Sequence, residues 1–278
     1  MRKHRPPPPS SASRISSALS APAAGGPSRH GVARVISKLG IASRSEAAEW
    51  VRAGRVCVNG RLANDPDHPV RVGLDPIDID GRRVGAARRL VLMLNKPRGL
   101  VTTARDEQGR ATVYRCLDGA ALPWLAPVGR LDKASEGLLL FCNDPAWAAR
   151  ILDPCSGPQK RYHVQIDRVP TPALLAALAD GAESDGETLN VASLRCLRTG
   201  SRNAWLEIVL DEGRNRHIRR LLAAFDLNVL RLILVAIGSL ALGELARGHW
   251  RVLTDAEAAD LQARAPGDAG GAYEPPQS

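Results

Sequence analysis

The sequence of 278 residues lacks several features that would mark a membrane, secreted or metal-binding protein. Its five cysteines form no C-x-x-C pair and its six histidines are scattered, which argues against a disulfide framework and against a zinc site. No apolar run approaches the ~18 residues needed to cross a bilayer, so we expect no membrane partner. This pattern is typical of a protein of the reducing cytoplasm.

Lysine is also scarce. Only five of the 38 basic residues are lysine, so arginine carries most of the formal net charge of +9. The planar guanidinium binds phosphate through two parallel hydrogen bonds and stacks on bases, which points to a polyanionic partner. A solvated basic surface explains the net charge equally well, because composition does not say where the charges lie. The positions of the cations along the chain must decide.

Length and local composition divide the chain. At roughly 100–200 residues per domain, the length predicts one large domain or a large domain with a small one. Residues 1–30 hold five cations, six prolines and seven serines but no acid, so we expect a disordered basic tail there. An organellar transit peptide is an alternative, although the run from Pro6 to Pro9 disfavours its amphipathic helix. Residues 265–278 are expected to form a second disordered tail.

Residues 31–84 have the pattern of a small α+β unit. Apolar residues recur at i, i+3, i+4 and i+7 from Val32 to Leu39, which predicts a helix. The segment from Ser43 to Glu46 has the form of a capping box that opens a second helix. Asn59-Gly60 then indicates a tight hairpin turn. Further short strands are predicted at residues 70–72 and 77–79.

The cations of this unit gather on its helices and hairpin. Residues 31–64 hold six cations against two acids. A solvated face would explain any single helix, but a patch across both helices and the hairpin favours phosphate binding. The unit resembles the S4 RNA-binding domain through the segment ARVISKLGIASRSEAAEWVRAGRVCVNGR, which implies RNA as the partner. The candidate RNA-binding residues are Arg34, Lys38, Ser43, Arg44, Arg52, Arg55 and Asn59.

Three further segments carry polar residues near predicted strands. A turn from Asn95 to Gly99, which contains Lys96, follows an apolar strand. Asp132 precedes an apolar strand at residues 138–142, which holds its carboxylate at the rim of the core as a turn residue or as a catalyst. Alternation over residues 160–166 places Tyr162 on one strand face, where its hydroxyl either caps the core or faces a site.

A fourth segment breaks two local rules. After the strand at residues 205–210, the predicted helix buries Ile218, Leu221, Leu222 and Phe225. Its first turns bear four cations, where the helix dipole favours acids, and like charges repeat at i, i+3 and i+4. An anion, either a phosphate or a buried carboxylate, would compensate, while simple solvation of the long side chains is the alternative. The four cations are Arg214, Arg216, Arg219 and Arg220.

The second unit resembles the RsuA/RluB/RluE/RluF family of ribosomal RNA pseudouridine synthases. The segments that carry the resemblance are LNKPRGLVTT, VGRLDKASEGLLLF, QKRYHV, EGRNRHIRR and LRLILVAIGSLALGELARGHWRVLT. The resemblance implies an α+β protein in which an S4 domain at 31–84 precedes a catalytic domain at 88–258. It implies that the catalytic domain has a mixed, mostly antiparallel sheet with flanking helices. A monomeric cytoplasmic isomerase without cofactor or metal is expected.

The resemblance also assigns roles to single residues. Asp132 matches the essential aspartate of the family, Tyr162 its active-site tyrosine and Arg219 the basic residue that pairs with the aspartate. His217 stands where the family more often has glutamine. The implied substrate-binding residues are Lys96, Arg130, Arg216, Arg220 and Leu232.

The implied reaction breaks the N1–C1′ bond of a uridine and rejoins the rotated uracil through C5, so the uridine should be flipped into a pocket. Asp132 could attack C1′ or abstract the 2′ proton, and both routes stay open. Two segments look closer to the large-subunit branch, which favours 23S over 16S ribosomal RNA or an assembly intermediate as partner. The alternatives are a non-catalytic RNA-binding or ribosome-assembly factor, and a glycosidase, which needs two acids flanking one bond.

Overall fold

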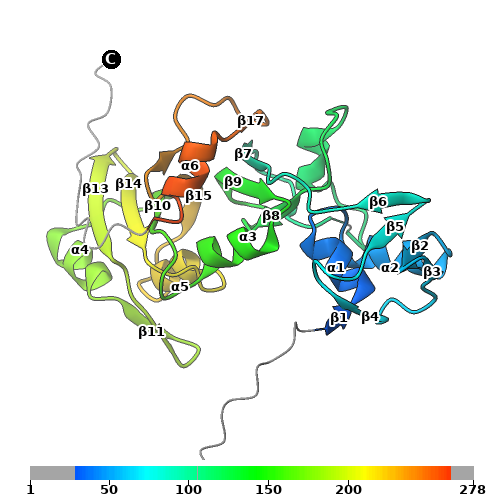
Figure 1. Ribbon diagram of the computed structural model, residues 1–278. Coiled ribbons are helices and arrows are strands. Elements are labelled where there is room, and N and C mark those ends of the chain that lie inside the picture. Colours follow the sequence, from blue (N-terminus) through cyan, green and yellow to red (C-terminus); the bar gives the residue numbers. More distant parts are fainter. Residues whose placement is uncertain (1–28, 105, 264–278) are drawn as a thin grey trace, which may run out of the picture.

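The computed structural model describes residues 29–104 and 106–263, and two separate apolar clusters divide them into an N-terminal and a C-terminal unit (Figure 1). The predicted tails lie outside the described residues except for Arg29 and His30. These two residues belong to strand β1 (Arg29–Gly31), which pairs antiparallel with β4 (Pro69–Arg71). The prediction of a disordered tail is therefore wrong for residues 29 and 30, because backbone pairing holds both of them in a strand.

The N-terminal unit packs two helices on a small sheet, as the sequence predicts. Ser43 caps the second helix, since its Oγ accepts a hydrogen bond from the Glu46 amide at 3.1 Å. Asn59 and Gly60 have φ of 52° and 74°, the left-handed values that a tight hairpin turn requires. The elements are α1 (Val32–Lys38), α2 (Arg44–Arg52), β2 (Val56–Val58), β3 (Arg61–Leu62), β5 (Ile77–Ile79) and β6 (Arg82–Val84), with strand order β3-β2-β5-β6.

The C-terminal unit is built on a nine-stranded mixed sheet, in agreement with the predicted fold class. Its main path runs β13-β14-β10-β15-β9-β7-β17, with β16 beside β15 and β8 beside β9. Every pairing is antiparallel except that of β9 with β15. The strands are β7 (Val91–Lys96), β8 (Ala126–Val128), β9 (Glu136–Cys142), β10 (Lys160–Ile166), β13 (Ser193–Thr199), β14 (Ala204–Leu210), β15 (Val229–Ile237), β16 (Leu240–Ala241) and β17 (Trp250–Val252).

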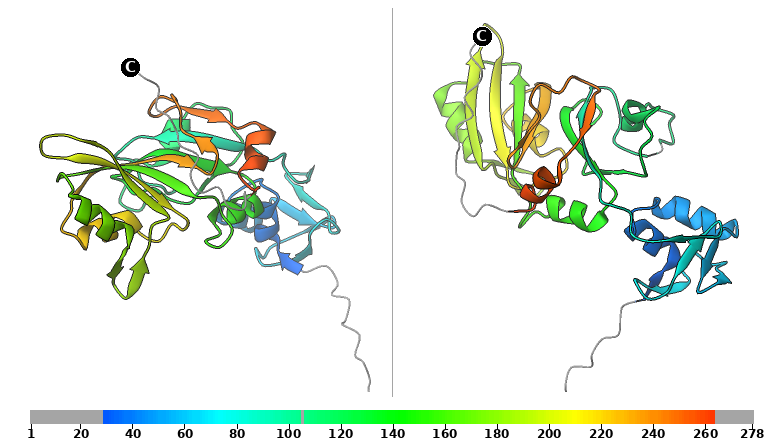
Figure 2. Two further views of the ribbon diagram at one scale, coloured as in Figure 1. Left: turned by 90° about the vertical axis from the view of Figure 1, so that its left-hand side faces the viewer. Right: turned by 45° about the horizontal axis from the view of Figure 1, so that its top comes forward.

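Helices flank this sheet and bury its apolar faces (Figures 1 and 2). Trp147 is fully buried and its Nε1 donates to the carbonyl of Ala258 at 2.9 Å, which joins the helices α3 and α6. None of the helices in the described part of the chain has the length and apolar character to span a bilayer. The remaining elements are α3 (Pro145–Leu152), α4 (Pro172–Ala179), α5 (His217–Ala223), α6 (Asp255–Asp260), the 3₁₀ helix η1 (Val113–Leu117) and the hairpin β11 (Ala182–Ser184) and β12 (Glu187–Leu189).

Candidate active site

The candidate site lies where the single parallel pairing joins the two halves of the sheet. At the start of β9, Gly137 has a φ of 105°, and a Cβ atom added there would lie 2.3 Å from the carbonyl oxygen of Leu234 on β15. Only glycine allows this close backbone approach. Gly137 belongs to the segment Arg130–Leu138, which has the form R-L-D-x-x-S/T-x-G-L, and it lets the start of β9 lie directly against β15. The loop of residues 129–135 precedes this contact.

Lys96, at the end of β7, holds this loop in place through hydrogen bonds. The fully buried Nζ donates to the carbonyl oxygens of Ser135 at 2.7 Å, Asp132 at 3.1 Å and Pro97 at 3.2 Å. Burial lowers the pKa of Lys96 to about 8, while the charge of Asp132 opposes that shift. The sequence predicts a substrate contact for Lys96, whereas the structure encloses its amine among carbonyls. We therefore revise its role to positioning of the loop.

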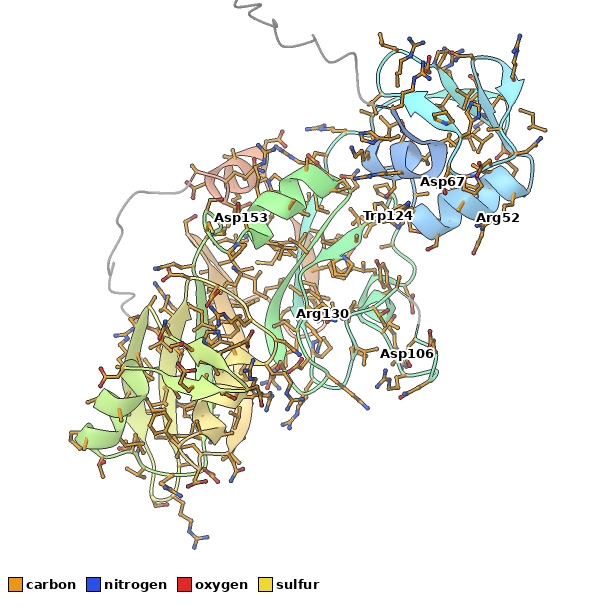
Figure 3. All side chains as sticks on the ribbon, turned by 90° about the horizontal axis from the view of Figure 1, so that it is seen from below. Arg52, Asp67, Asp106, Trp124, Arg130 and Asp153 are labelled. Atoms are coloured by element: carbon orange, nitrogen blue, oxygen red, sulfur yellow. The ribbon has the colours of Figure 1, made fainter. Side chains whose placement is uncertain are left out.

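A cavity brings together most of the catalytic and substrate-binding residues that the sequence singles out, although they come from distant parts of the chain. Arg130 and Asp132 reach it from the loop before β9, Tyr162 from β10 and Leu232 from β15. Arg216 and Arg219 line it from the start of α5. Figure 3 labels Arg130 within the C-terminal unit, well apart from Arg52 on α2.

Asp132 and Arg219 form an ion pair in this cavity. The Nε of Arg219 lies 3.7 Å from Oδ2 of Asp132, and its Nη2 donates to Oγ of Ser135 at 3.4 Å. Burial lowers the pKa of Arg219, and the charge of Asp132 opposes that shift. Because the arginine is largely buried and the carboxylate is open to solvent, the pair presents an anion whose outer side can contact a ligand.

Tyr162 lies in the same cavity, with only 9% of its surface exposed. Burial, and to a lesser degree the charge of Asp132, raises the pKa of Tyr162 to about 12. Its phenol therefore keeps its proton at neutral pH. The ring forms an apolar wall of the cavity, and the hydroxyl can donate a hydrogen bond.

The arginines around α5 are arranged differently from the prediction. Arg216 is the N-cap residue with a left-handed φ of 51°, so it precedes the helix, and the predicted stack of three arginines on one helix face is wrong. Arg220 pairs with Glu187 at 2.6 Å and with Asp185 at 3.2 Å on the β11–β12 hairpin. Since these acids hold its guanidinium, we revise the predicted substrate contact of Arg220 to a structural ion pair.

Carboxylates compensate Arg219 and Arg220, the two arginines that lie within this helix, and a carboxylate is one of the two kinds of anion expected from the sequence. Arg219 faces the carboxylate of Asp132, and Arg220 faces the two acids of the hairpin. Both compensating groups are carboxylates of the chain. Asp132 lies 87 residues before Arg219 in the sequence, and the acids of the hairpin lie about 33 residues before Arg220. The sequence of the helix alone therefore does not identify these partners.

Two buried polar residues of the cavity, Ser135 and His217, were not assigned a site role from the sequence. Ser135 lines the cavity three residues after Asp132, at the S/T position of the R-L-D-x-x-S/T-x-G-L element, which is the signal that identifies it. His217 is 3% exposed, and burial lowers its pKa. In the sequence, the only feature that marks His217 is that the family more often has glutamine at this position.

The predicted RNA-binding residues of the N-terminal unit divide into two sets. Arg34, Lys38 and Arg52 are exposed on α1 and α2, and Arg44 is exposed with Asp67 at 4.0 Å. The other three make structural contacts: Ser43 caps α2, Arg55 pairs with Asp80 and lies over the Trp50 ring, and Asn59 donates to Asp75 at 3.3 Å.

No cluster of three or more His, Cys, Asp or Glu side chains suited to a metal ion occurs among residues 29–104 and 106–263. The cavity offers instead one open carboxylate, four arginines, a buried tyrosine and a buried histidine. This set can bind a phosphate-bearing ligand and can supply a nucleophile or a base.

Comparison with known proteins shows which proteins this chain resembles. A family model described as RNA pseudouridylate synthase matches residues 90–224, and one described as S4 domain matches residues 32–75. An uncharacterized RNA pseudouridine synthase of Rickettsia bellii is 37% identical over 223 residues, covering 80% of this chain and 96% of the relative. Ribosomal large subunit pseudouridine synthase B of Bacillus subtilis is 32% identical over 234 residues, covering 84% and 95%. A crystal structure of a pseudouridylate synthase matches with a TM-score of 0.58 and 27% identity, covering 84% of this chain and 99% of that one.

Proposed function

The chain belongs to the RNA pseudouridine synthase family, and on that premise we propose that it isomerises a uridine of 23S ribosomal RNA with Asp132 as its catalytic carboxylate. Its similarity to ribosomal large subunit pseudouridine synthase B supports the large-subunit RNA as substrate. Such a substrate implies that the enzyme works in the cytoplasm, where bacterial-type ribosomes assemble, and a single chain holds every group that the reaction needs.

One observation carries this proposal: the open carboxylate of Asp132 faces a cavity while its other side is paired with the largely buried Arg219. A carboxylate held in this way can reach the ribose of a nucleotide that enters the cavity. A binding module would not need an anion at this position, because a phosphate-binding surface gains from cations alone.

The chemistry follows from this placement. The N1–C1′ bond of the uridine breaks as the Asp132 carboxylate attacks C1′ or takes the 2′ proton. The detached uracil rotates and a C5–C1′ bond forms. As it forms, either the Asp132–C1′ bond breaks or the proton returns from Asp132 to C2′, so the carboxylate is regenerated. The proton that leaves C5 goes to solvent while N1 gains one, so the product is an isomer of the substrate.

The other cavity residues serve binding in this proposal. The ring of Tyr162 packs against the uracil, because its phenol stays protonated and cannot act as a phenolate base at neutral pH. The wall at Leu232 favours the flat apolar faces of the base. Arg130 and Arg216 hold the phosphates of the flipped nucleotide.

The two units divide the work in the same proposal. Residues 31–84 form the S4 domain that holds structured RNA, and residues 88–258 form the catalytic domain. The exposed cations on α1 and α2 are the phosphate contacts of the S4 domain.

Tritium release tests the substrate. Full-length 23S and 16S transcripts that carry 5-tritiated uridine are incubated with the wild-type chain, and the tritium in water is measured. We expect release from 23S RNA in proportion to one site per molecule. Release from 16S RNA alone would move the substrate to the small subunit, and RNA binding without any release would favour the non-catalytic RNA-binding factor.

A further inference from the structure

The two domains meet at a small junction beside the chain that links them. Their apolar clusters are separate, so no shared core fixes one domain on the other. Figures 1 and 2 show the S4 domain beside the end of the synthase domain that carries α3. Domains joined in this way move relative to each other by default, unless specific contacts hold them.

Gly40 provides the first such contact. It lies in the turn between α1 and α2 with a φ of 73°, and a Cβ atom added there would lie 2.6 Å from the carbonyl oxygen of Asn143. Asn143 lies in the turn between β9 and α3 of the synthase domain. The backbones of the two domains therefore touch at a point where any side chain on residue 40 would force them apart.

The side chain of Asn143 provides the second contact, because it holds the first residues of the synthase domain, directly after the linker. It is 2% exposed, its Oδ1 accepts from the Leu90 amide at 2.8 Å, and its Nδ2 donates to the Arg88 carbonyl at 3.0 Å. On the other side, the amide of Ala87 donates to the Leu39 carbonyl at 2.8 Å. The linker is thus hydrogen bonded to the residue before Gly40, and the residues that follow the linker are hydrogen bonded to Asn143.

The exposed ion pair near this junction does not join the two domains. Arg88 and Asp255 approach to 3.4 Å, but both residues belong to the synthase domain, and both side chains lie mostly in solvent, where such pairs contribute little. The backbone contact of Gly40 with Asn143 and the Ala87–Leu39 hydrogen bond therefore support a fixed arrangement of the domains.

We infer that Gly40 and Asn143 form an interdomain lock that sets the position of the S4 domain on the synthase domain, and thereby selects which uridine of a large RNA reaches Asp132. The claim about target choice rests on the proposed function, while the lock itself does not. Arg52 of the S4 domain and Arg130 of the cavity lie far apart in Figure 3. A small rotation at the junction therefore displaces RNA held by the S4 domain relative to the cavity. Asn143 is a positioning residue in this scheme.

The matched pair Gly40→Ala and Gly54→Ala tests the lock in the full chain. Both glycines follow an S4 helix with nearly equal φ, 73° and 71°, but Gly54 has no neighbouring atom within 4 Å of an added Cβ. The two variants carry the same backbone strain and differ in the contact with Asn143. Thermal unfolding first establishes that both variants fold, and Asn143→Ala is the second test if Gly40→Ala does not.

Two measurements then test the domain arrangement and its effect on activity. Small-angle X-ray scattering should show a larger maximum dimension for Gly40→Ala, with Gly54→Ala like the wild type. Tritium release from full-length 23S RNA should fall by about tenfold or more in kcat/KM for Gly40→Ala, since displacement by an ångström can cost that much. On a hairpin too short to reach the S4 domain, kcat should be unchanged.

Equal maximum dimensions for the two glycine variants would show that the interdomain lock does not exist. Altered scattering with unchanged activity on full-length RNA would overturn its role in target choice. Absence of tritium release by the wild type would refute the proposed function instead, and the scattering comparison would still decide whether the lock exists.

Discussion

The Nε of Arg219 lies 3.7 Å from Oδ2 of Asp132, and the two side chains differ in exposure, 17% against 42%. The cation is thus held inside the protein while the anion faces the cavity. Arg219 is also bound to Oγ of Ser135, in the loop that Lys96 secures. The catalytic carboxylate of our proposal is therefore fixed by its partners and does not depend on the substrate for its position.

Removal of Arg219 should impair the chemical step. Arg219→Ala leaves Asp132 without its opposite charge, so we expect kcat to fall by about 10²–10³, the order found when one charge-stabilising group is removed, with little change in KM. Single-turnover tritium release measures this loss. Arg220→Ala is the control, because this neighbouring arginine pairs with the β11–β12 hairpin and should leave kcat near the wild-type value. An Arg219→Ala rate within twofold of the wild type would refute the assignment.

Tyr162 should act through its ring. Since its pKa is raised to about 12, the phenol stays protonated at neutral pH and does not serve as the base at C5. The kcat of Tyr162→Phe should therefore fall by less than the ~10²–10⁴-fold that general-base catalysis contributes. Tyr162→Leu, which removes the ring, should lower kcat further than Tyr162→Phe does. Rates of the two variants on the same transcript make the comparison. A Phe variant as inactive as the Leu variant would show that the hydroxyl is essential.

The activity should decline in alkaline solution because of Lys96. Its pKa is lowered to about 8, so below this pH the ammonium offers three N–H groups to three carbonyls, and above it the neutral amine offers two. The loop with Asp132 then loses one of its restraints, and kcat should fall reversibly as the pH rises past about 8.

The pH profile of kcat with saturating RNA measures this effect. Tyr162 cannot cause a transition near pH 8, because its pKa is about 12. Lys96→Arg, which stays charged, should flatten the alkaline limb if the variant folds. A wild-type kcat that stays constant to about pH 9 would contradict the positioning role of Lys96.

The S4 domain should bind RNA through phosphate contacts. Replacement of its four exposed cations by alanine should lower the affinity for 23S RNA and flatten the plot of log K against log salt by about one unit per lost contact. Filter binding at several salt concentrations measures the slope. Arg55→Ala is the control, because Asp80 already occupies its guanidinium. An unchanged slope would show that this surface is not the RNA clamp. The four cations are Arg34, Lys38, Arg44 and Arg52.

Trp147 should be essential to the stability of the synthase domain. The side chain is fully buried and holds α6 through its hydrogen bond to Ala258, so Trp147→Ala should lower the free energy of unfolding by about 3–5 kcal/mol. Urea denaturation measures the loss. Trp124→Ala, at a partly exposed position, should cost much less, and equal losses would contradict this account of the core.

Local patterns predict much of this fold because their causes are local. The helices α1 and α2, the cap at Ser43 and the left-handed turn at Asn59 and Gly60 depend on residues a few positions apart. The mixed sheet follows from the family resemblance. Asp132, Tyr162 and Arg219 are separated by tens of residues, and their meeting in one cavity depends on the parallel pairing of β9 with β15, which spacing does not predict.

Long-range partners account for the revised roles. A lysine in a turn after a strand has the appearance of a surface residue, yet the β7–β9 pairing encloses Lys96 beneath the loop before β9. Arg220 has the appearance of a phosphate ligand, yet the β11–β12 hairpin supplies two acids from about 33 residues earlier in the chain. Such contacts are set by topology, which no local pattern contains.

Tritium release by Asp132→Ala and Asp132→Asn tests the central claim most directly. Both variants and the wild type are incubated with 23S RNA that carries 5-tritiated uridine, and RNA affinity is measured in parallel. We predict background release from both variants together with wild-type affinity, because the carboxylate performs the chemistry and the S4 domain performs the binding. Measurable turnover by either variant would contradict the assignment of Asp132 as the catalytic carboxylate.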